Sequence, residues 1–278
     1  MEAMEPEPSR SYDVLLQSKL GLKDFEWTEN EWPTLGYMDF SPTHDLPVFS
    51  LAAAVEDGMM MEPPLELCEA LVEAAQRWGF FQVSEHGVPL DLLVRTRQAC
   101  VHFFDEVPPQ QKQKGGRQLG LPLGYSASNP DYGVNLPWTE ILQLQQSPDK
   151  IHLFAERVWG PSHSLHSSLA ETLIQYTQAL ERLGMAILQM FAIGLGLEKE
   201  HFSKHFTEGD TTLIRVNRYP PCPNPRKILG LGQHTDPQSL TLLLQDEVGG
   251  LQVLMDDLWV AVKPRPDCFV VNVGDTLE

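Results

Sequence analysis

The sequence predicts an α+β fold that is mainly β in its C-terminal part, and three observations support this. Before residue 194, apolar residues recur every three or four positions in several segments, as on one face of a helix. After about residue 210 the apolar period changes to two, which is typical of strands. The expected strands are short and closely spaced, with turn residues between them, and this pattern favours a sandwich or a jelly roll.

Three segments carry the helical period. Residues 64–78 have apolar side chains on one face, begin near a proline and end at a glycine. Residues 90–106 form a second helix that stops before Pro108 and Pro109. The longest periodic segment is 162–193, where leucine, tyrosine and isoleucine recur at helical spacing. A helix-rich part therefore precedes the β core.

The remaining N-terminal segments are not helical in pattern. Residues 1–44 mix acidic residues with tryptophan and proline, and we expect an extended or partly ordered lead-in. Residues 45–51 predict a short strand, and 79–89 predict a strand followed by a turn. Residues 107–137 are rich in glycine, proline, serine and asparagine and predict a long loop, which in a compact protein is often functional.

The C-terminal part predicts six strands separated by proline, glycine or aspartate turns. These strands cover residues 212–218, 229–235, 240–245, 250–255, 258–262 and 268–273. We accordingly divide the chain into a lead-in, a helix-rich region and a β core. The three parts are residues 1–44, 45–205 and 206–278.

Composition excludes some classes of partner. The net charge of −18 disfavours nucleic acid and anionic membrane surfaces, which bind through lysine and arginine. The first residues carry no apolar core of a signal peptide, and no apolar run is long enough to span a bilayer. The cysteines are far apart and form no CxxC pair, so we expect a reduced, cytoplasmic protein. They are Cys68, Cys100, Cys222 and Cys268.

The segment GQHTDPQSL contains a candidate metal site. If it is a strand, His234 and Asp236 point to the same face and can reach one point. An imidazole and a carboxylate, completed by a second histidine, form the facial triad of non-haem Fe(II) oxygenases. The chain has nine histidines, so chance also produces such a pair. An exposed His-Thr-Asp turn is the alternative.

The segment RVNRYPPC predicts a polar strand face. Arg215, Asn217 and Tyr219 alternate along it and would form a wall of a cation, an amide and a phenol. Such a wall suits an anionic ligand that carries a carbonyl group. The alternative is a solvated strand face closed by a Pro-Pro turn.

Several motifs in order resemble the plant 2-oxoglutarate- and Fe(II)-dependent dioxygenases. NRYPPCP, LGLGQHTDPQSLTLLLQDEVGGLQV and VVNVGD resemble the catalytic core of that family. DLPVFSL and GFFQVSEHGVP resemble its N-terminal signatures, although Glu85 stands where asparagine is commoner. The resemblance runs from about residue 45 to the last residue.

The resemblance implies a double-stranded β-helix, which is a jelly roll, with iron held inside. By motif match, His234 and Asp236 are iron ligands, and Asn217 and Tyr219 bind 2-oxoglutarate. Arg215 lines the same pocket. The implied cofactors are Fe(II), 2-oxoglutarate as cosubstrate, O2, and ascorbate as reductant. The implied reaction oxidises a C–H bond while 2-oxoglutarate loses CO2 and becomes succinate.

Within this family, LPWTE and QDEVGGLQV look most like the gibberellin oxidases, especially the 20-oxidases. WVAVKPRPD and NRYPPCP also resemble the 2-oxidases that act on C20 gibberellins. The expected substrate is an apolar carboxylic acid bound by a monomer, and Trp138 either lines its pocket or packs in the core. The alternatives are another apolar plant metabolite, such as a flavonoid, and a form without catalysis.

Three other histidines need an interpretation. His201 and His205 stand four apart on an expected helix, which is a metal spacing, but a solvated helix face is the simpler explanation. His86 ends a strand at a turn that the family keeps for structural reasons, and we assign it no chemistry.

No histidine follows Asp236 in the sequence. The resemblance places a second histidine, and an arginine for the far carboxylate of 2-oxoglutarate, beyond the NVGD segment. We therefore expect a fragment, a truncated isoform or an incomplete gene model that lacks the last core strands. Exposed apolar surface costs roughly 25 cal/mol per Å², against a net stability of about 5–15 kcal/mol. We expect such a chain to be marginally stable and to have little turnover.

Overall fold

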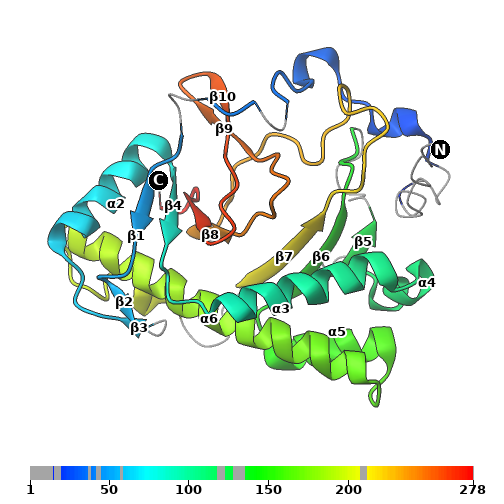
Figure 1. Cartoon of the computed structure of the whole chain (residues 1–278), viewed down its shortest axis with the longest axis horizontal. Coiled ribbons are helices and arrows are strands. Elements are labelled where there is room, and N and C mark those ends of the chain that lie inside the picture. The colour runs from blue at the N-terminus through cyan, green and yellow to red at the C-terminus, as the bar shows by residue number, and fades with distance from the viewer. Residues whose placement is uncertain are drawn as a thin grey trace, which may run out of the picture. The chain divides into compact units, whose positions relative to one another are not determined.

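The computed structural model describes residues 15, 20–36, 39–41, 45–56, 59–117, 123–127, 135–206 and 212–277. The described residues form both helices and sheets, with runs of consecutive strands near each end, which confirms the α+β prediction (Figure 1). The α-helices among the described segments include α2 (Leu65–Trp78), α3 (Leu90–Val101), α4 (Pro109–Lys112), α5 (Pro148–Trp159) and α6 (Ser164–Gly194). None of the described helices is both long and apolar enough to cross a membrane.

In the part of the chain that the structure describes, the strands form four sheets. Strands β1 (Val48–Ser50), β4 (Phe80–Ser84), β11 (Phe269–Val273) and β8 (Leu240–Leu243) lie in that order in the first. Strands β9 (Gln252–Met255) and β10 (Leu258–Ala261) pair, as do β2 (Val55–Glu56) and β3 (Met59–Met60). The fourth sheet contains β5 (Gly124–Ala127), β6 (Glu140–Gln145) and β7 (Leu213–Arg218).

Contacts divide the chain into two compact units, and each combines segments that are distant in sequence. The first unit comprises Met1–Pro33, Arg95–Ile174 and Thr211–Gln233. The second comprises Thr34–Val94, Gln175–Asp210 and His234–Glu278. Our division of the sequence at residues 44 and 205 stays a prediction.

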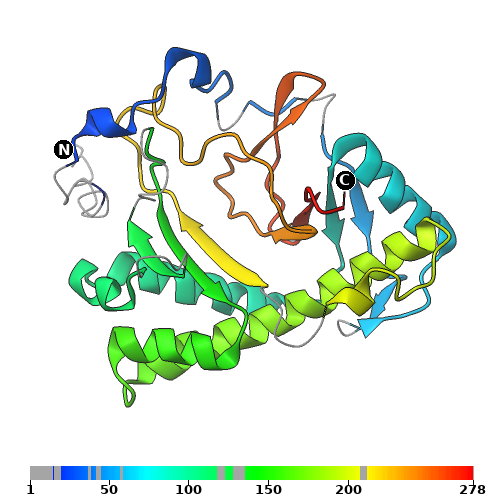
Figure 2. The same cartoon turned by 180° about the vertical axis from the view of Figure 1, so that it is seen from behind.

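The core of the first unit lies between the sheet β5–β6–β7 and its helices, and Figure 2 shows this sheet in green and yellow. Tyr125 of β5 and Leu142 of β6 pack with Phe154 of α5 and Leu173 of α6. Phe103 belongs to a π-helical turn, His102–Glu106, that continues α3 and joins the same cluster. These rings and aliphatic side chains are buried, so they hold the sheet on the helices.

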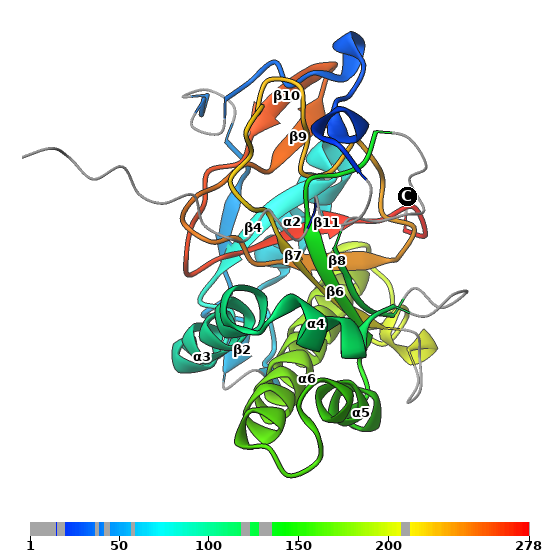
Figure 3. The ribbon, with the colours of Figure 1, turned by 90° about the vertical axis from the view of Figure 1, so that its right-hand side faces the viewer.

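The first sheet of the second unit has two different faces. On one face, Phe81 of β4 makes an edge-to-face contact with Phe191 of α6, with 6.0 Å between ring centroids. On the other face, Val270 of β11 packs with Val253 of β9 and Val262. Side chains alternate along a strand, so Asn272 shares this second face with Val270. Figure 3 shows β8 and β11, which pair side by side on this sheet.

Most predicted helices and strands are present, but two of the predicted segments were wrong. Residues 229–235 form no strand, although their motif is the one that carries His234. The region 107–137 is not one long loop, because its described residues include α4, a 3-10 turn and strand β5. The expected lead-in contains two 3-10 turns, Leu22–Phe25 and Glu29–Glu31.

Candidate metal centre

His234 and Asp236 lie close together without the help of a strand. The distance from His234 Nε2 to Asp236 Oδ1 is 3.6 Å. The imidazole is about half exposed and the carboxylate is a quarter exposed, at 49% and 25% of side-chain area. Both therefore remain accessible to a ligand, and their donor atoms converge as a shared metal would require.

The second carboxylate oxygen of Asp236 is held from the sheet. Thr241 Oγ1 donates to Asp236 Oδ2 at 2.7 Å, and Asn272 Nδ2 donates to the same oxygen at 3.0 Å. Thr241 of β8 and Asn272 of β11 are opposite each other in the antiparallel ladder. The sheet thus presents two hydrogen-bond donors at one point. The loop before β8, residues 234–239, brings the Asp236 carboxylate to them.

The backbone just after β11 is hydrogen bonded to the same loop. Gly274 N donates to Ser239 O at 3.1 Å, and Asp275 N donates to Asp236 O at 2.9 Å. A Cβ atom on Gly274 would lie 1.9 Å from Gln238 O, so only glycine allows this approach. The NVGD motif therefore has a role that sequence reasoning missed, which is to hold the HTD motif in place.

Side chains add two further contacts between these motifs. Thr235 Oγ1 donates to Asp275 Oδ2 at 3.1 Å, and Thr276 Oγ1 donates to Pro237 O at 2.7 Å. The loop has no ladder of strand hydrogen bonds, so these bonds to residues 274–276 supply its order.

The donor set fits iron in part. A histidine nitrogen and a carboxylate oxygen are two of the three ligands of the 2-His-1-carboxylate type. In the part of the chain that the structure describes, no group of three His, Cys, Asp or Glu side chains gathers around one point. His234 and Asp236 thus lie together as a pair, and their role as iron ligands stays a prediction.

Arg215 and Asn217 share a face of β7, as the sequence predicted. Arg215 Nε donates to Asn217 Oδ1 at 3.0 Å. Tyr219 follows the strand, is about half exposed, and covers Gly230, where a Cβ would lie 2.6 Å from the ring. These three residues belong to the first unit, whereas His234 and Asp236 belong to the second. Their role in binding 2-oxoglutarate stays a prediction.

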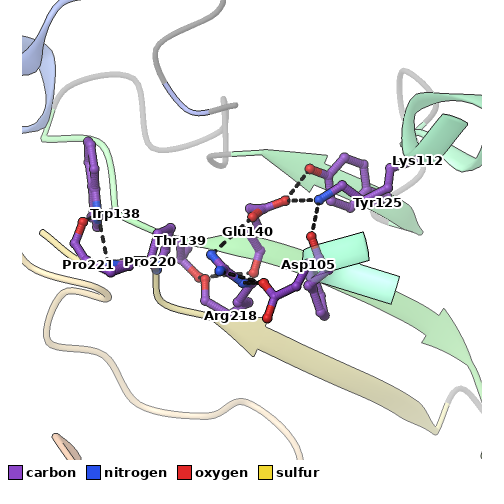
Figure 4. Close-up of polar contacts among 10 residues, drawn as sticks. Asp105, Lys112, Tyr125, Trp138, Thr139, Glu140, Arg218, Pro220 and Pro221 are labelled. Atoms are coloured by element: carbon purple, nitrogen blue, oxygen red, sulfur yellow. Dashed lines mark hydrogen bonds and ion pairs between the residues drawn. The ribbon is translucent and has the colours of Figure 1, made fainter. Parts of the chain in front are cut away.

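The LPWTE segment is part of the core of the first unit. Trp138 is 2% exposed, meets Phe25 edge to face at 5.0 Å, and donates from Nε1 to Pro220 O at 3.1 Å. This favours core packing over a pocket wall for Trp138. Figure 4 shows the indole directed at Pro220 and Pro221, and Glu140 surrounded by polar side chains.

Glu140 is fully buried and bonded to three side chains. Lys112 Nζ donates to Oε2 at 2.7 Å, the Tyr125 hydroxyl donates to the same oxygen, and Arg218 Nη1 lies 3.4 Å from Oε1. Arg218 also contacts Asp105. Burial, followed by the charge of Glu140, raises the pKa of Tyr125, so its hydroxyl stays a donor. No sequence pattern pointed to Lys112 or Tyr125.

Among the described residues, His86, His201 and His205 belong to no group of three metal-binding side chains. His201 lies in a turn and His205 ends a 3-10 turn, Ser203–His205, so the expected helical spacing was wrong. His86 is buried, and its Nδ1 accepts from Val88 N at 3.1 Å, which agrees with a structural role.

Comparisons with known proteins define the class. Residues 211–278 match the model of the 2OG-Fe(II) oxygenase superfamily. Residues 46–164 match a model described as non-haem dioxygenase in morphine synthesis, N-terminal. With the His-Asp pair and the α+β fold, these matches define a 2-oxoglutarate- and Fe(II)-dependent dioxygenase, which is an oxidoreductase.

Sequence relatives define the branch of the family. Gibberellin 20 oxidase 1-B of Triticum aestivum is 36% identical over 256 residues, which are 91% of this chain and 67% of that protein. Gibberellin 20 oxidase 4 of Arabidopsis thaliana is 33% identical over 267 residues, 92% of this chain and 67% of that protein. The chain belongs to the gibberellin-oxidase-like plant dioxygenases and spans about two thirds of the length of these relatives.

Solved structures agree with the jelly-roll prediction. A crystal structure of JOX2 in complex with 2OG, Fe and JA matches with a TM-score of 0.71 and 30% identity, covering 100% of this chain and 76% of that one. A structure of dioxygenase for auxin oxidation 1 from Arabidopsis thaliana with 2-oxoglutarate matches with a TM-score of 0.67 and 27% identity, covering 84% and 80%.

Proposed function

We propose that the protein oxidises a gibberellin in a reaction that depends on Fe(II), 2-oxoglutarate and O2, with 20-oxidation ahead of 2-oxidation. The observation that carries the proposal is the convergence of His234 Nε2 and Asp236 Oδ1 at 3.6 Å, within a motif that matches the oxygenase model. The relatives named gibberellin 20 oxidase support the substrate class.

In this proposal His234 and Asp236 hold the iron. When bound, the iron supplies the redox chemistry that joins oxygen activation to decarboxylation of 2-oxoglutarate. The imidazole supplies a neutral nitrogen, and the carboxylate compensates one positive charge of the metal. The protein's own contribution is to fix these two donors at one edge of the first sheet.

Arg215, Asn217 and Tyr219 are proposed to bind 2-oxoglutarate. Because Asn217 Oδ1 accepts from Arg215 Nε, the amide NH2 is the group that can donate to a carboxylate. The phenol of Tyr219 is a second donor, and the guanidinium of Arg215 complements the dianion. In this proposal Arg215 and Asn217 on one face of β7, with Tyr219 just after the strand, give the ligand one polar wall.

The finer points are also proposals. Ascorbate is the expected reductant, and a monomer is the expected state. The cytoplasm is the expected location, because all four cysteines are free thiols. The substrate is expected to sit in a mostly apolar pocket with one polar anchor for its carboxylate.

The test is a panel of substrates with Fe(II), 2-oxoglutarate and ascorbate. C20 gibberellins, C19 gibberellins and a flavanone are compared by equilibrium binding and by substrate-dependent succinate release. We expect C20 gibberellins to bind best, and His234→Ala to abolish any succinate release. Preferential binding of the flavanone would favour the rival substrate. Gibberellin binding without turnover would favour a non-catalytic binding form.

A further inference from the structure

The two oxygens of Asp236 have different surroundings. Oδ2 accepts two hydrogen bonds, from Thr241 at 2.7 Å and from Asn272 at 3.0 Å. Oδ1 is the oxygen that lies 3.6 Å from His234 Nε2. One oxygen is thus committed to the sheet, and the other is on the side of the imidazole.

We propose that Thr241 and Asn272 are positioning residues that assign Oδ1 of Asp236 to the metal. The inference rests on the proposed iron site. A carboxylate can rotate about its last side-chain bond, and either oxygen or both can then face a cation. Two donors on Oδ2 oppose that rotation, so a single oxygen is presented beside the imidazole.

The placement of Asn272 is unusual for a residue that only fills the core. It is 7% exposed and lies in the strand FVVNV, where its neighbours are valines. A buried amide costs free energy unless it is hydrogen bonded, whereas another valine would cost none. Its bond to Asp236 compensates for that burial, which explains why a polar side chain stands at this point of the strand.

Thr241 reaches the same oxygen from the neighbouring strand. Thr241 and Asn272 are paired across β8 and β11, so their side chains leave the sheet on one face and at one level. The backbone of Asp236 is tied to the same place through Asp275 N at 2.9 Å. Asn272 of β11 therefore holds the side chain of Asp236, and Asp275, just after the strand, holds its backbone.

The experiment measures metal binding rather than turnover. Co(II) replaces Fe(II), and its dissociation constant is followed by its visible spectrum and by the paramagnetic shifts of the His234 ring protons. We expect Thr241→Val and Asn272→Leu each to weaken Co(II) binding about 10–100-fold, the usual effect of losing a partner of a metal ligand. The matched control is Thr96→Val, a buried threonine on α3, which should bind Co(II) like the wild type.

A second set of variants, built on Asp236→Ala, separates a positioning role from a general loss of stability. In Asp236→Ala, adding Thr241→Val or Asn272→Leu should change the residual Co(II) affinity no further, because the bonded oxygen is gone. A further loss of Co(II) affinity in these double variants would overturn the inference. Unchanged Co(II) binding in the two single variants, while Asp236→Ala binds weakly, would also overturn it. Neither result contradicts the iron site itself. Should Asn272→Leu fail to fold, the isosteric Thr241→Val decides.

The proposed function fails in a distinguishable way. If His234→Ala and Asp236→Ala both bind Co(II) like the wild type, the metal is held elsewhere, and the roles assigned to Thr241 and Asn272 fall with the site.

Discussion

Lys112 Nζ donates a 2.7 Å hydrogen bond to Glu140 Oε2, and both side chains are buried, at 1% and 0% exposure. The same ammonium donates to Phe104 O at 2.7 Å. A charge taken out of water is costly unless it is paired and hydrogen bonded, and both partners here are. The pair connects α4 to the central strand of the sheet β5–β6–β7.

Replacing Lys112 with methionine should therefore destabilise the protein strongly. Glu140 would remain buried with less compensation, and breaking such a pair costs about 3–5 kcal/mol. Urea unfolding measures the effect. The control is Lys114→Met, an exposed lysine two residues on, for which we expect a change within about 0.5 kcal/mol. Equal losses in the two variants would contradict the structural role of the pair.

Gly274→Ala should distort the loop that carries His234 and Asp236. The added Cβ meets Gln238 O at 1.9 Å and Asp236 O at 2.6 Å, both backbone atoms that cannot move without shifting the loop. We expect a loss of about 1–3 kcal/mol from overpacking, together with weaker Co(II) binding. Thermal unfolding and metal titration check the two effects.

Gly184→Ala is the matched control for that change. Its Cβ would meet only Leu242 Cδ1 at 3.8 Å, an ordinary contact, and the residue lies within α6. Alanine is the better helix former by about 1 kcal/mol, so this variant should be neutral or more stable. A Gly274→Ala variant as stable as Gly184→Ala would show that the close approach is wrong.

Trp138→Phe tests whether the LPWTE segment acts through packing. The change removes the indole donor and leaves Pro220 O without that bond, which costs about 1–3 kcal/mol for a buried group. Trp78→Phe, at the partly exposed end of α2, should cost much less. We expect gibberellin affinity of the folded Trp138 variant to stay near that of the wild type. If Trp138→Phe lost gibberellin affinity while its stability stayed unchanged, Trp138 would line the substrate pocket instead.

His86 should make stability depend on pH. Burial lowers its pKa, and Asp267 opposes this to a smaller extent. The neutral ring is favoured in the folded state, because Nδ1 accepts from Val88 N. The unfolded chain therefore takes up the proton first as pH falls below about 6.5. This stabilisation is present at neutral pH and is lost as pH falls through the lower pKa of the folded state.

The measurement is urea unfolding at a series of pH values from 7.5 to 5. An unperturbed histidine, with a pKa of about 6.5, goes from mostly neutral to mostly charged over this range. His86→Gln keeps a side-chain acceptor and carries no charge, so its stability should fall less steeply over this range. If the free energy of unfolding fell equally steeply with pH in the wild type and in His86→Gln, His86 would not contribute to the pH dependence.

Periodic segments were the predictable part of the fold. The expected helices at 64–78 and 162–193 correspond to α2 and α6, because burial of one face repeats along each of them. The expected strand at 229–235 failed for a reason that is not local. Gly230 lies under Tyr219 and Gly232 lies under Trp27, where any Cβ would clash with a ring. These glycines serve close packing, and among the described residues the segment pairs with no strand.

The sequence by itself determined the family, the His-x-Asp pair and the polar residues Arg215, Asn217 and Tyr219, because these are choices of residue type in ordered motifs. Only the tertiary structure decided what holds the pair. The register between β8 and β11 places Thr241 opposite Asn272, and both then meet Asp236. Such contacts join residues up to 36 positions apart, so they depend on strand pairing and leave no local pattern in the chain.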